Sequence, residues 1–189
     1  PFLANLFLHY YENKWIRTNK KRDNNKVGRF TNVFRFIDNL VAINEKFEKC
    51  YSQIYPPEFE LKKENIGYSE GTFLDLMIGI RDNKFFISLY DKRDTFPFAI
   101  VRMPHLDSNI PSKIFYSAFG GEILRFARNT SDPNLFKDNA KCLIHRMLKQ
   151  GGKNNILTNI LKKLYGRHFD TFSKYCNNYL DFVNMIEVN

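Results

Sequence analysis

The pattern of hydrophobic and polar positions divides the chain into two parts. Up to about residue 103, short apolar runs that alternate with polar residues predict strands between short helices. From residue 112 onward, apolar residues recur at three- and four-residue intervals, which predicts helices. Residues 104–111 begin and end with proline and form the predicted linker. The pattern therefore indicates an α+β chain with an N-terminal part of residues 1–103 and an all-α part of residues 104–189.

The first segment, up to about Thr18, has the spacing of an amphipathic helix. Its predicted apolar stripe consists of Phe2, Leu3, Leu6, Phe7, Tyr10 and Ile16. Residues 19–29 are rich in Lys, Arg and Asn and are predicted to form an exposed loop. This basic segment has two interpretations, a solvated surface or a binding surface for backbone phosphates.

Two apolar runs within residues 30–44 meet at Asp38-Asn39 and predict a hairpin with these two residues in its turn. Asp and Asn tolerate the positive φ angles of tight turns. The Asp38 carboxylate is therefore expected at the tip of a rigid ribbon. On turn statistics alone Asp38 is a turn former. A rigidly held carboxylate is also what metal-dependent chemistry on phosphates requires.

The rest of the N-terminal part is predicted to form short elements. These are a helix at 45–55, an edge strand at 59–64, a turn at 67–71, a strand at 72–80 paired with one at 85–90, and a strand at 98–101. Between them, residues 91–94 form a dense charge cluster. It has two interpretations, a salt-bridged corner or a site that binds nucleic-acid backbone.

Three helices and a weaker fourth are predicted in the C-terminal part. They cover residues 112–129, a segment that starts at Ser131-Asp132-Pro133 and stops at Gly151-Gly152, a segment that stops near Gly166, and residues 169–180. Ser131 is the predicted N-cap of the second helix. The predicted core residues are Phe115, Phe119, Ile123, Leu124, Phe126, Phe136, Ala140, Leu143, Ile144, Met147, Leu148, Ile156, Ile160, Leu161 and Leu164.

Composition and charge favour a partner with negative charge. The 189 residues carry a formal net charge of +9, and nucleic acid is the commonest polyanion. Residues 141–167 contain no acidic side chain, and their basic residues are Lys141, Arg146, Lys149, Lys153, Lys162, Lys163 and Arg167. The 19 Phe and 10 Tyr residues suit a core, and some could instead stack on bases.

Several classes of protein lack support in the sequence. The three cysteines are far apart, which argues against a zinc ribbon or a disulfide scaffold and favours an intracellular, unsecreted protein, with the nucleus as one candidate compartment. The histidines are scattered, and no P-loop, Rossmann or Gly-x-Ser-x-Gly motif occurs. No apolar run reaches the length of a membrane span, so no membrane partner is expected.

Four segments together resemble a known family. Arg35-Phe36-Ile37-Asp38-Asn39-Leu40 resembles the aromatic-x-Asp-Asp hairpin of reverse transcriptases, in a form similar to that of Penelope-like elements. The segment from Pro1 to Leu8 resembles the end of the helix that precedes this hairpin. A third likeness, to the strand that grips the primer end in this family, lies in Thr72-Phe73-Leu74-Asp75-Leu76-Met77-Ile78. The segment from Leu89 to Thr95 is similar to the strand that follows the primer-gripping strand. The likeness extends to about His168.

The resemblance implies an RNA-directed DNA polymerase, with residues 1–103 as the C-terminal part of the palm and residues 104–189 as a helical thumb. It implies Mg²⁺ as cofactor, Asp38 as a catalytic metal ligand and Asn39 as its catalytic neighbour. RNA template and DNA primer are the implied partners, together with an N-terminal palm and fingers that are missing here. The implied nucleic-acid contacts are Phe73, Leu74, Asp75, Arg93, Lys141, Arg146, Lys149, Lys153, Lys162 and Lys163.

Two departures from the family pattern bear on activity. Asn39 stands where the family has a second hairpin Asp, and the strand that carries the upstream catalytic Asp is absent from this sequence. The chain is therefore expected to be a fragment that does not polymerise alone. The alternative is a non-catalytic nucleic-acid-binding protein, a remnant or repurposed relative of a reverse transcriptase.

Overall fold

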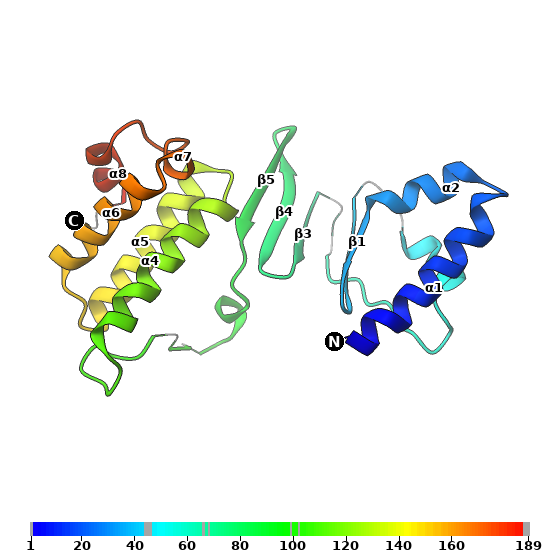
Figure 1. The fold of residues 1–189 in the computed structure, drawn as a ribbon, viewed down its shortest axis with the longest axis horizontal. Coiled ribbons are helices and arrows are strands. Elements are labelled where there is room, and N and C mark those ends of the chain that lie inside the picture. The colour runs from blue at the N-terminus through cyan, green and yellow to red at the C-terminus, as the bar shows by residue number, and fades with distance from the viewer. Residues whose placement is uncertain are drawn as a thin grey trace. The chain divides into compact units, whose positions relative to one another are not determined.

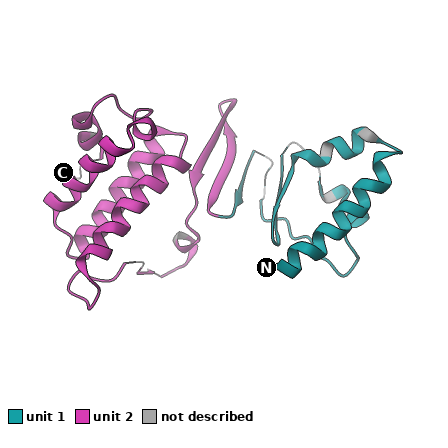
Figure 2. Cartoon of the chain, in the orientation of Figure 1, with its two compact units in different colours: residues 1–74 teal, residues 75–189 magenta. Residues whose placement is uncertain are grey.

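The chain folds as a mixed α+β structure with small antiparallel sheets. The computed structural model describes residues 2–43, 47–65, 67, 69–98, 100–101 and 103–186. Two compact units are present, residues 1–74 and residues 75–189 (Figures 1 and 2). The α+β class is as predicted. The boundary between the two compact units lies between residues 74 and 75, whereas the boundary predicted from the sequence lies between residues 103 and 104.

The first unit places helices and one hairpin around a small apolar cluster. Its elements are α1 (Phe2–Lys20), α2 (Asn24–Arg29), η1 (Phe30–Asn32), β1 (Val33–Phe36), β2 (Asn39–Ala42), η2 (Phe47–Lys49), α3 (Tyr51–Ile54) and β3 (Glu70–Phe73). The buried residues of the cluster are Leu8, Trp15, Phe47, Ile54 and Tyr55. Side chains from α1, from the end of α3 and from the segment before it therefore make this core.

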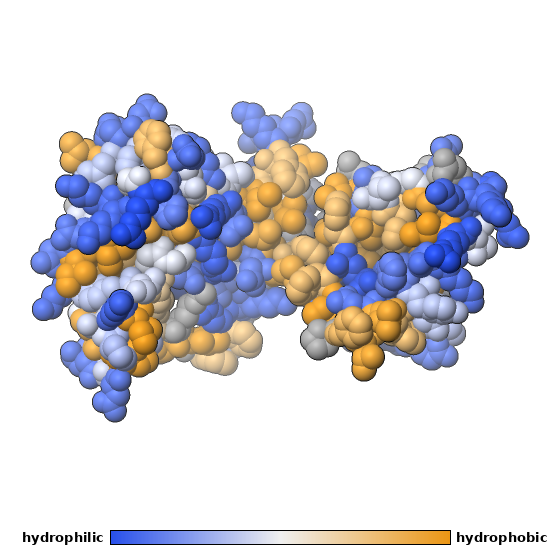
Figure 3. All heavy atoms as spheres, viewed as in Figure 1, coloured by the Kyte–Doolittle hydropathy of each residue, from blue (hydrophilic) through white to orange (hydrophobic). Residues whose placement is uncertain are grey.

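Helix α1 is confirmed, but the predicted buried face is wrong. The residues buried on it are Leu8, Glu12 and Trp15, which follow a spacing of four and three. Of the predicted stripe, Ile16 is half-buried, whereas Phe2, Leu3, Leu6, Phe7 and Tyr10 are exposed. Figure 3 shows hydrophobic side chains, in orange, on the surface of the protein. Periodicity predicts the helix correctly, and the packing of β1 and α3 decides which face is covered.

The predicted loop at 19–29 is in part helical. Asp23 caps α2, because its carboxylate accepts a hydrogen bond from the Lys26 backbone N at 3.0 Å. Val27 and Phe30 then pack against the Trp15 cluster. Val27 within the basic segment and Phe30 directly after it thus attach the segment to the core.

The β1–β2 hairpin is confirmed, with its turn one residue earlier than predicted. The pairs run from Val33 opposite Ala42 to Phe36 opposite Asn39, so the two turn residues are Ile37 and Asp38. Ile37 adopts φ +56°. Asn39 is the first residue of β2 and not a turn residue.

Five other predictions for the N-terminal part need correction. Within the helix predicted at 45–55, residues 45–46 lie outside the described residues, and the remainder forms the short η2 and α3. Residues 59–64 form no strand, nor do 98, 100 and 101, the described part of the strand predicted at 98–101. The single strand predicted at 72–80 is broken by a turn at Leu74-Asp75, where Leu74 has φ +56°. Residues 67–71, predicted as a turn, already include the start of β3.

The second unit combines a hairpin with a helical bundle. Its elements are β4 (Leu76–Arg81), β5 (Lys84–Leu89), η3 (Lys92–Thr95), α4 (Ser112–Asn129), α5 (Pro133–Lys149), α6 (Asn154–Arg167), α7 (Phe169–Phe172) and α8 (Tyr179–Ile186). The β4–β5 turn at Asp82-Asn83 has positive φ at both residues, as a type I′ turn requires. The weak helix predicted at 169–180 is instead two helices, α7 and α8.

The helical core follows the predicted apolar positions of α4 and α5. Phe119, Ile123, Phe136, Ala140 and Met147 are fully buried. The core also contains Leu157, Tyr165, Phe172, Phe182 and Ile186, none of which was among the predicted core residues. Of the predicted core positions, Leu124, Phe126, Leu148, Ile160 and Leu164 are only partly buried.

The β4–β5 hairpin belongs to the helical unit because β5 is attached to the start of α5. The Ser131 backbone N donates to the Ile87 carbonyl at 2.9 Å, and the Ile87 backbone N donates to Ser131 Oγ at 2.9 Å. Ser131 is therefore not the cap of α5. Asp132 caps this helix and accepts from the backbone N of Asn134 at 2.7 Å.

Candidate functional site

The tip of the β1–β2 hairpin carries the candidate catalytic residues. Asp38 is the second turn residue, and its side chain is exposed. Asn39 begins β2 and donates a side-chain hydrogen bond to Asp38 Oδ1 at 3.3 Å. The amide of Asn39 thus faces the carboxylate of Asp38, and both stand at the exposed end of a paired ribbon.

The backbone at this tip is strained. A positive φ at the first residue of a two-residue turn is typical of type II′, where glycine is usual. Here the residue is Ile37, whose branched Cβ disfavours φ +56°. Such conformations persist only where surrounding contacts impose them, and they are concentrated at functional sites.

Arg35 supplies such a contact. Its Nη1 donates to the Ile37 carbonyl at 3.0 Å and to Asn5 Oδ1 at 2.8 Å. Its Nε and Nη2 donate to the two carboxylate oxygens of Glu12 at 2.6 and 3.1 Å. The hydroxyl of Tyr55 donates to Glu12 Oε1 at 2.7 Å. We call Asn5, Glu12, Arg35 and Tyr55 the Arg35 cluster.

The Arg35 cluster holds a charged pair in a largely buried place. Glu12 is 9% exposed. The hydrogen bond to Glu12 raises the pKa of Arg35, and burial, followed by the bond to Glu12, raises the pKa of Tyr55. Arg35 therefore stays charged and the Tyr55 hydroxyl stays protonated at all physiological pH values.

The oxygen atoms at the hairpin tip fit one part of a magnesium site. Mg²⁺ prefers carboxylate, carbonyl and water oxygens, and the Asp38 carboxylate with the Asn39 amide oxygen supplies two such groups. Among the described residues, no three His, Cys, Asp or Glu side chains are grouped closely enough to hold a metal ion. Asp38 can thus act as one ligand of a site whose other ligands come from elsewhere.

The predicted primer-contacting residues lie around the turn that follows β3. Phe73 is half-buried in β3, whereas Leu74 and Asp75 are exposed. In the second unit, Arg125 Nη1 on α4 lies 3.5 Å from Asp75 Oδ2, and its Nη2 lies 3.0 Å from Glu122 Oε2. Asp75 is thus one of two acidic partners of the Arg125 guanidinium.

The charge cluster at 91–94 contains an ion pair, as its structural interpretation requires. Arg93 Nε donates to Asp91 Oδ1 at 2.6 Å, and Arg93 Nη2 pairs with Asp91 Oδ2. Both side chains also line an open pocket of about 470 Å³ whose other walls are Phe96, Pro97, Phe98, Ile100 and Arg146. The structure thus brings together Arg93 and Arg146, two predicted nucleic-acid contacts, beside two exposed rings whose centroids lie 5.5 Å apart.

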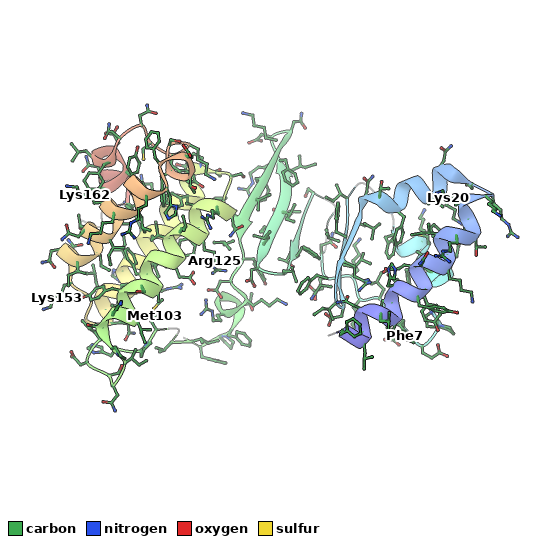
Figure 4. The ribbon with its side chains drawn as sticks, in the orientation of Figure 1. Phe7, Lys20, Met103, Arg125, Lys153 and Lys162 are labelled. Atoms are coloured by element: carbon green, nitrogen blue, oxygen red, sulfur yellow. The ribbon has the colours of Figure 1, made fainter. Side chains whose placement is uncertain are left out.

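The basic residues of 141–167 are divided between two helices. Lys141, Arg146 and Lys149 belong to α5, Lys162, Lys163 and Arg167 belong to α6, and Lys153 precedes α6. Both helices pack mainly on α4 and α8 rather than on each other. Lys162 lies over the Tyr179 ring at 5.7 Å from its centroid. Figure 4 shows Lys153 and Lys162 on the outer side of the helical unit.

Sequence reasoning missed the Arg35 cluster and Arg125. A partial signal existed, because Glu12 lies four residues after Leu8 and three before Trp15, in the middle of a potential apolar face. An acidic residue in that position needs a buried cationic partner. The identity of that partner could not be found from spacing, because Arg35 lies 23 residues away.

Comparisons with protein-family models, with curated proteins and with solved structures found no match. Within the described part of the chain, no helix combines the length and the apolar character needed to cross a membrane.

Proposed function

We propose that this chain is part of an RNA-directed DNA polymerase that joins nucleotides on a template with the help of Mg²⁺. The observation that carries the proposal is the exposed Asp38 carboxylate beside a strained turn, on a hairpin fixed to α1 by a largely buried ion pair. Polymerase chemistry on phosphates depends on positioning and on neutralising charge, and a rigid carboxylate at a ribbon tip meets that requirement.

In this proposal Asp38 is the metal-binding catalytic residue, and Asn39 adds a weaker oxygen ligand beside it. When bound, Mg²⁺ polarises phosphoryl oxygens and neutralises the charge that develops on them. The β1–β2 ribbon orients Asp38, and the Arg35 cluster holds the ribbon. The remaining acidic ligand would come from the upstream palm strand of the resembling family, in a longer chain with palm and fingers.

The second unit is proposed to hold the duplex of RNA template and DNA primer. The exposed basic side chains of α5 and α6 suit phosphate contacts, and the exposed Phe96 and Phe98 suit base stacking. The proposed identities of palm and thumb rest on the same resemblance. An intracellular location, with the nucleus as one candidate compartment, is proposed from the three widely spaced cysteines.

Primer extension in a longer chain that carries the upstream palm strand tests the proposal. Asp38→Ala should abolish extension and leave duplex binding nearly unchanged, because only interactions stronger in the transition state carry catalysis. Asp138→Ala, at an exposed position of α5, is the matched control and should retain full extension. Extension that survives Asp38→Ala would refute the assignment of the hairpin.

Asn39→Asp provides an independent arm of the same assay. It adds a second carboxylate at the tip, and it should raise extension most strongly at low Mg²⁺, where metal occupancy limits the rate. Equal extension by the parent and the variant across a Mg²⁺ titration would show that this position does not contact the metal.

A second candidate function is non-catalytic nucleic-acid binding, and Asn39 favours it because an amide binds hard cations more weakly than a carboxylate. Binding of a duplex by this chain should weaken with salt, and each phosphate contact removed should lower the log-log slope by about 0.9 for DNA. The double variant Lys149→Glu, Lys153→Glu should lower both affinity and slope, whereas Lys113→Glu on α4 should have little effect. Salt-dependent binding without extension in the longer chain would favour this second function.

A further inference from the structure

The hydrogen bonds of the Arg35 cluster use every nitrogen of one guanidinium group. Nε and Nη2 face the two oxygens of Glu12, and Nη1 is shared between Asn5 Oδ1 and the Ile37 carbonyl. Tyr55 donates to the same Glu12 oxygen that accepts from Nε. Asn5 and Glu12 of α1 thus bind Arg35 of β1 directly, and Tyr55, which follows α3, binds Glu12.

The bond from Arg35 to the Ile37 carbonyl reaches the peptide group that joins Ile37 to Asp38. This peptide begins at the Cα of Ile37, where φ is +56°, and its orientation is set by ψ of Ile37 and φ of Asp38. A change of ψ at Ile37 that φ of Asp38 did not compensate would turn this peptide and redirect the Asp38 Cα–Cβ bond and its carboxylate. A donor fixed by a bidentate ion pair therefore restrains the peptide from which Asp38 follows.

A role in stability alone explains this arrangement poorly. A buried ion pair contributes little net stability relative to apolar residues of similar size, because desolvation offsets the attraction. The planar fork of Arg, unlike the ammonium group of Lys, can hold Glu12 with two nitrogens while a third nitrogen reaches the turn. What the pair provides is a fixed geometry at the hairpin tip.

We propose that Arg35, held by Glu12 and Tyr55, is a positioning residue that fixes the Ile37–Asp38 peptide and so aims the Asp38 carboxylate at the metal. The inference rests on the proposed function, since it takes Asp38 to be a metal ligand. It assigns Glu12 and Tyr55 to the same task, as the residues that orient the guanidinium group.

Manganese binding to this chain, followed by NMR, tests the inference without any need for polymerase activity. Mn²⁺ favours the same oxygen ligands as Mg²⁺ and broadens the signals of nuclei near it. In the parent chain, Mn²⁺ should broaden the amide signals of Asp38 and Asn39 first. Asp38→Ala should remove this selective broadening.

The decisive variant is Arg35→Lys, which keeps the charge but cannot make the same set of bonds. It should shift the amide signals of Ile37 and Asp38 and raise the Mn²⁺ concentration for half-broadening by roughly tenfold, the lower end of the effect of residues that orient metal ligands. Tyr55→Phe removes one hydroxyl and keeps the ring. It should shift the Ile37 and Asp38 amide signals and raise the Mn²⁺ concentration for half-broadening, each by less than Arg35→Lys does. Arg17→Lys, at an exposed position of α1, is the matched control and should change neither.

The outcomes separate this inference from the proposed function. If Asp38→Ala removes the broadening while folded Arg35→Lys and Tyr55→Phe chains bind Mn²⁺ like the parent, the positioning role is overturned and Asp38 remains a ligand. If Asp38→Ala leaves the broadening unchanged, Asp38 is not a ligand, and both proposals are overturned. If Arg35→Lys does not fold, Tyr55→Phe decides, because unchanged turn signals and Mn²⁺ binding in that variant overturn the positioning role.

Discussion

The attachment of β5 to Ser131 can be tested by removing one hydroxyl group. Ser131 Oγ accepts from the Ile87 backbone N at 2.9 Å and lies 3.3 Å from the Ile87 carbonyl oxygen, to which it donates. Ser131→Ala removes both bonds. The backbone bond from Ser131 N to the Ile87 carbonyl, at 2.9 Å, does not depend on the side chain and should remain.

The expected cost follows from the surroundings of the Ile87 amide. An unsatisfied buried donor costs about 1–3 kcal/mol, and since Ile87 is only half-buried, water can replace part of the loss. We therefore expect a local destabilisation of about 1 kcal/mol. That value corresponds to a roughly fivefold larger population of the open hairpin edge.

Amide hydrogen exchange at Ile87 measures this effect directly, since exchange of a protected amide reports local opening. Ser131→Ala should accelerate exchange at Ile87, whereas Ser131→Thr keeps a hydroxyl and should restore much of the protection. Ser117→Ala, at an exposed position of α4, is the matched control. Unchanged exchange at Ile87 in Ser131→Ala would show that the hydroxyl does not attach β5 to the helical unit.

Two further predictions concern the helical unit. Asp132→Ala should lower the free energy of unfolding, measured by urea titration, by about 0.5–2 kcal/mol, because the Asp132 carboxylate caps α5. Asp132→Asn keeps a capping side chain and should lose much less stability. An equal loss in both variants would contradict the capping role. Burial, followed by the charge of Asp181, raises the pKa of the Cys176 thiol to about 11. At pH 8, iodoacetamide should therefore modify the exposed Cys142 much faster than Cys176, as measured by mass spectrometry. Equal modification rates of the two cysteines would argue against the burial of Cys176.

The helical part of the fold was largely predictable from the sequence. Phe115, Phe119 and Ile123 recur at helical spacing, and their neighbours in the bundle are other helices with the same simple pattern. The first unit was less predictable, because α1 has apolar residues on more than one face. The exposed Phe7 and the buried Leu8 are adjacent in sequence, and only tertiary packing separates them.

Turns were predictable where their residues were typical and not otherwise. Asp82-Asn83 carries the expected residues for positive φ and lies between the strands predicted at 72–80 and 85–90. Leu74 and Ile37 adopt the same region of φ without being Gly, Asn or Asp, so one turn was missed and the other was displaced by one residue. Of the candidate site, Asp38 could be found from its place between two apolar runs. The Arg35 cluster could not be predicted from the sequence, because it depends on contacts between segments that are far apart in the chain.

The position of Trp15 gives this chain a built-in optical probe. It is the single tryptophan of the sequence, it is 7% exposed, and its ring lies 5.8 Å from Phe30 and 5.6 Å from Lys26 Nζ. Its emission therefore reports on the first unit alone, whereas stacked rings such as Phe136 and Tyr175, 4.2 Å apart, belong to the second. Unfolding curves recorded by tryptophan fluorescence and by amide exchange in α5 can thus be compared within one molecule, and separate midpoints would mean that the two units melt as independent cooperative blocks.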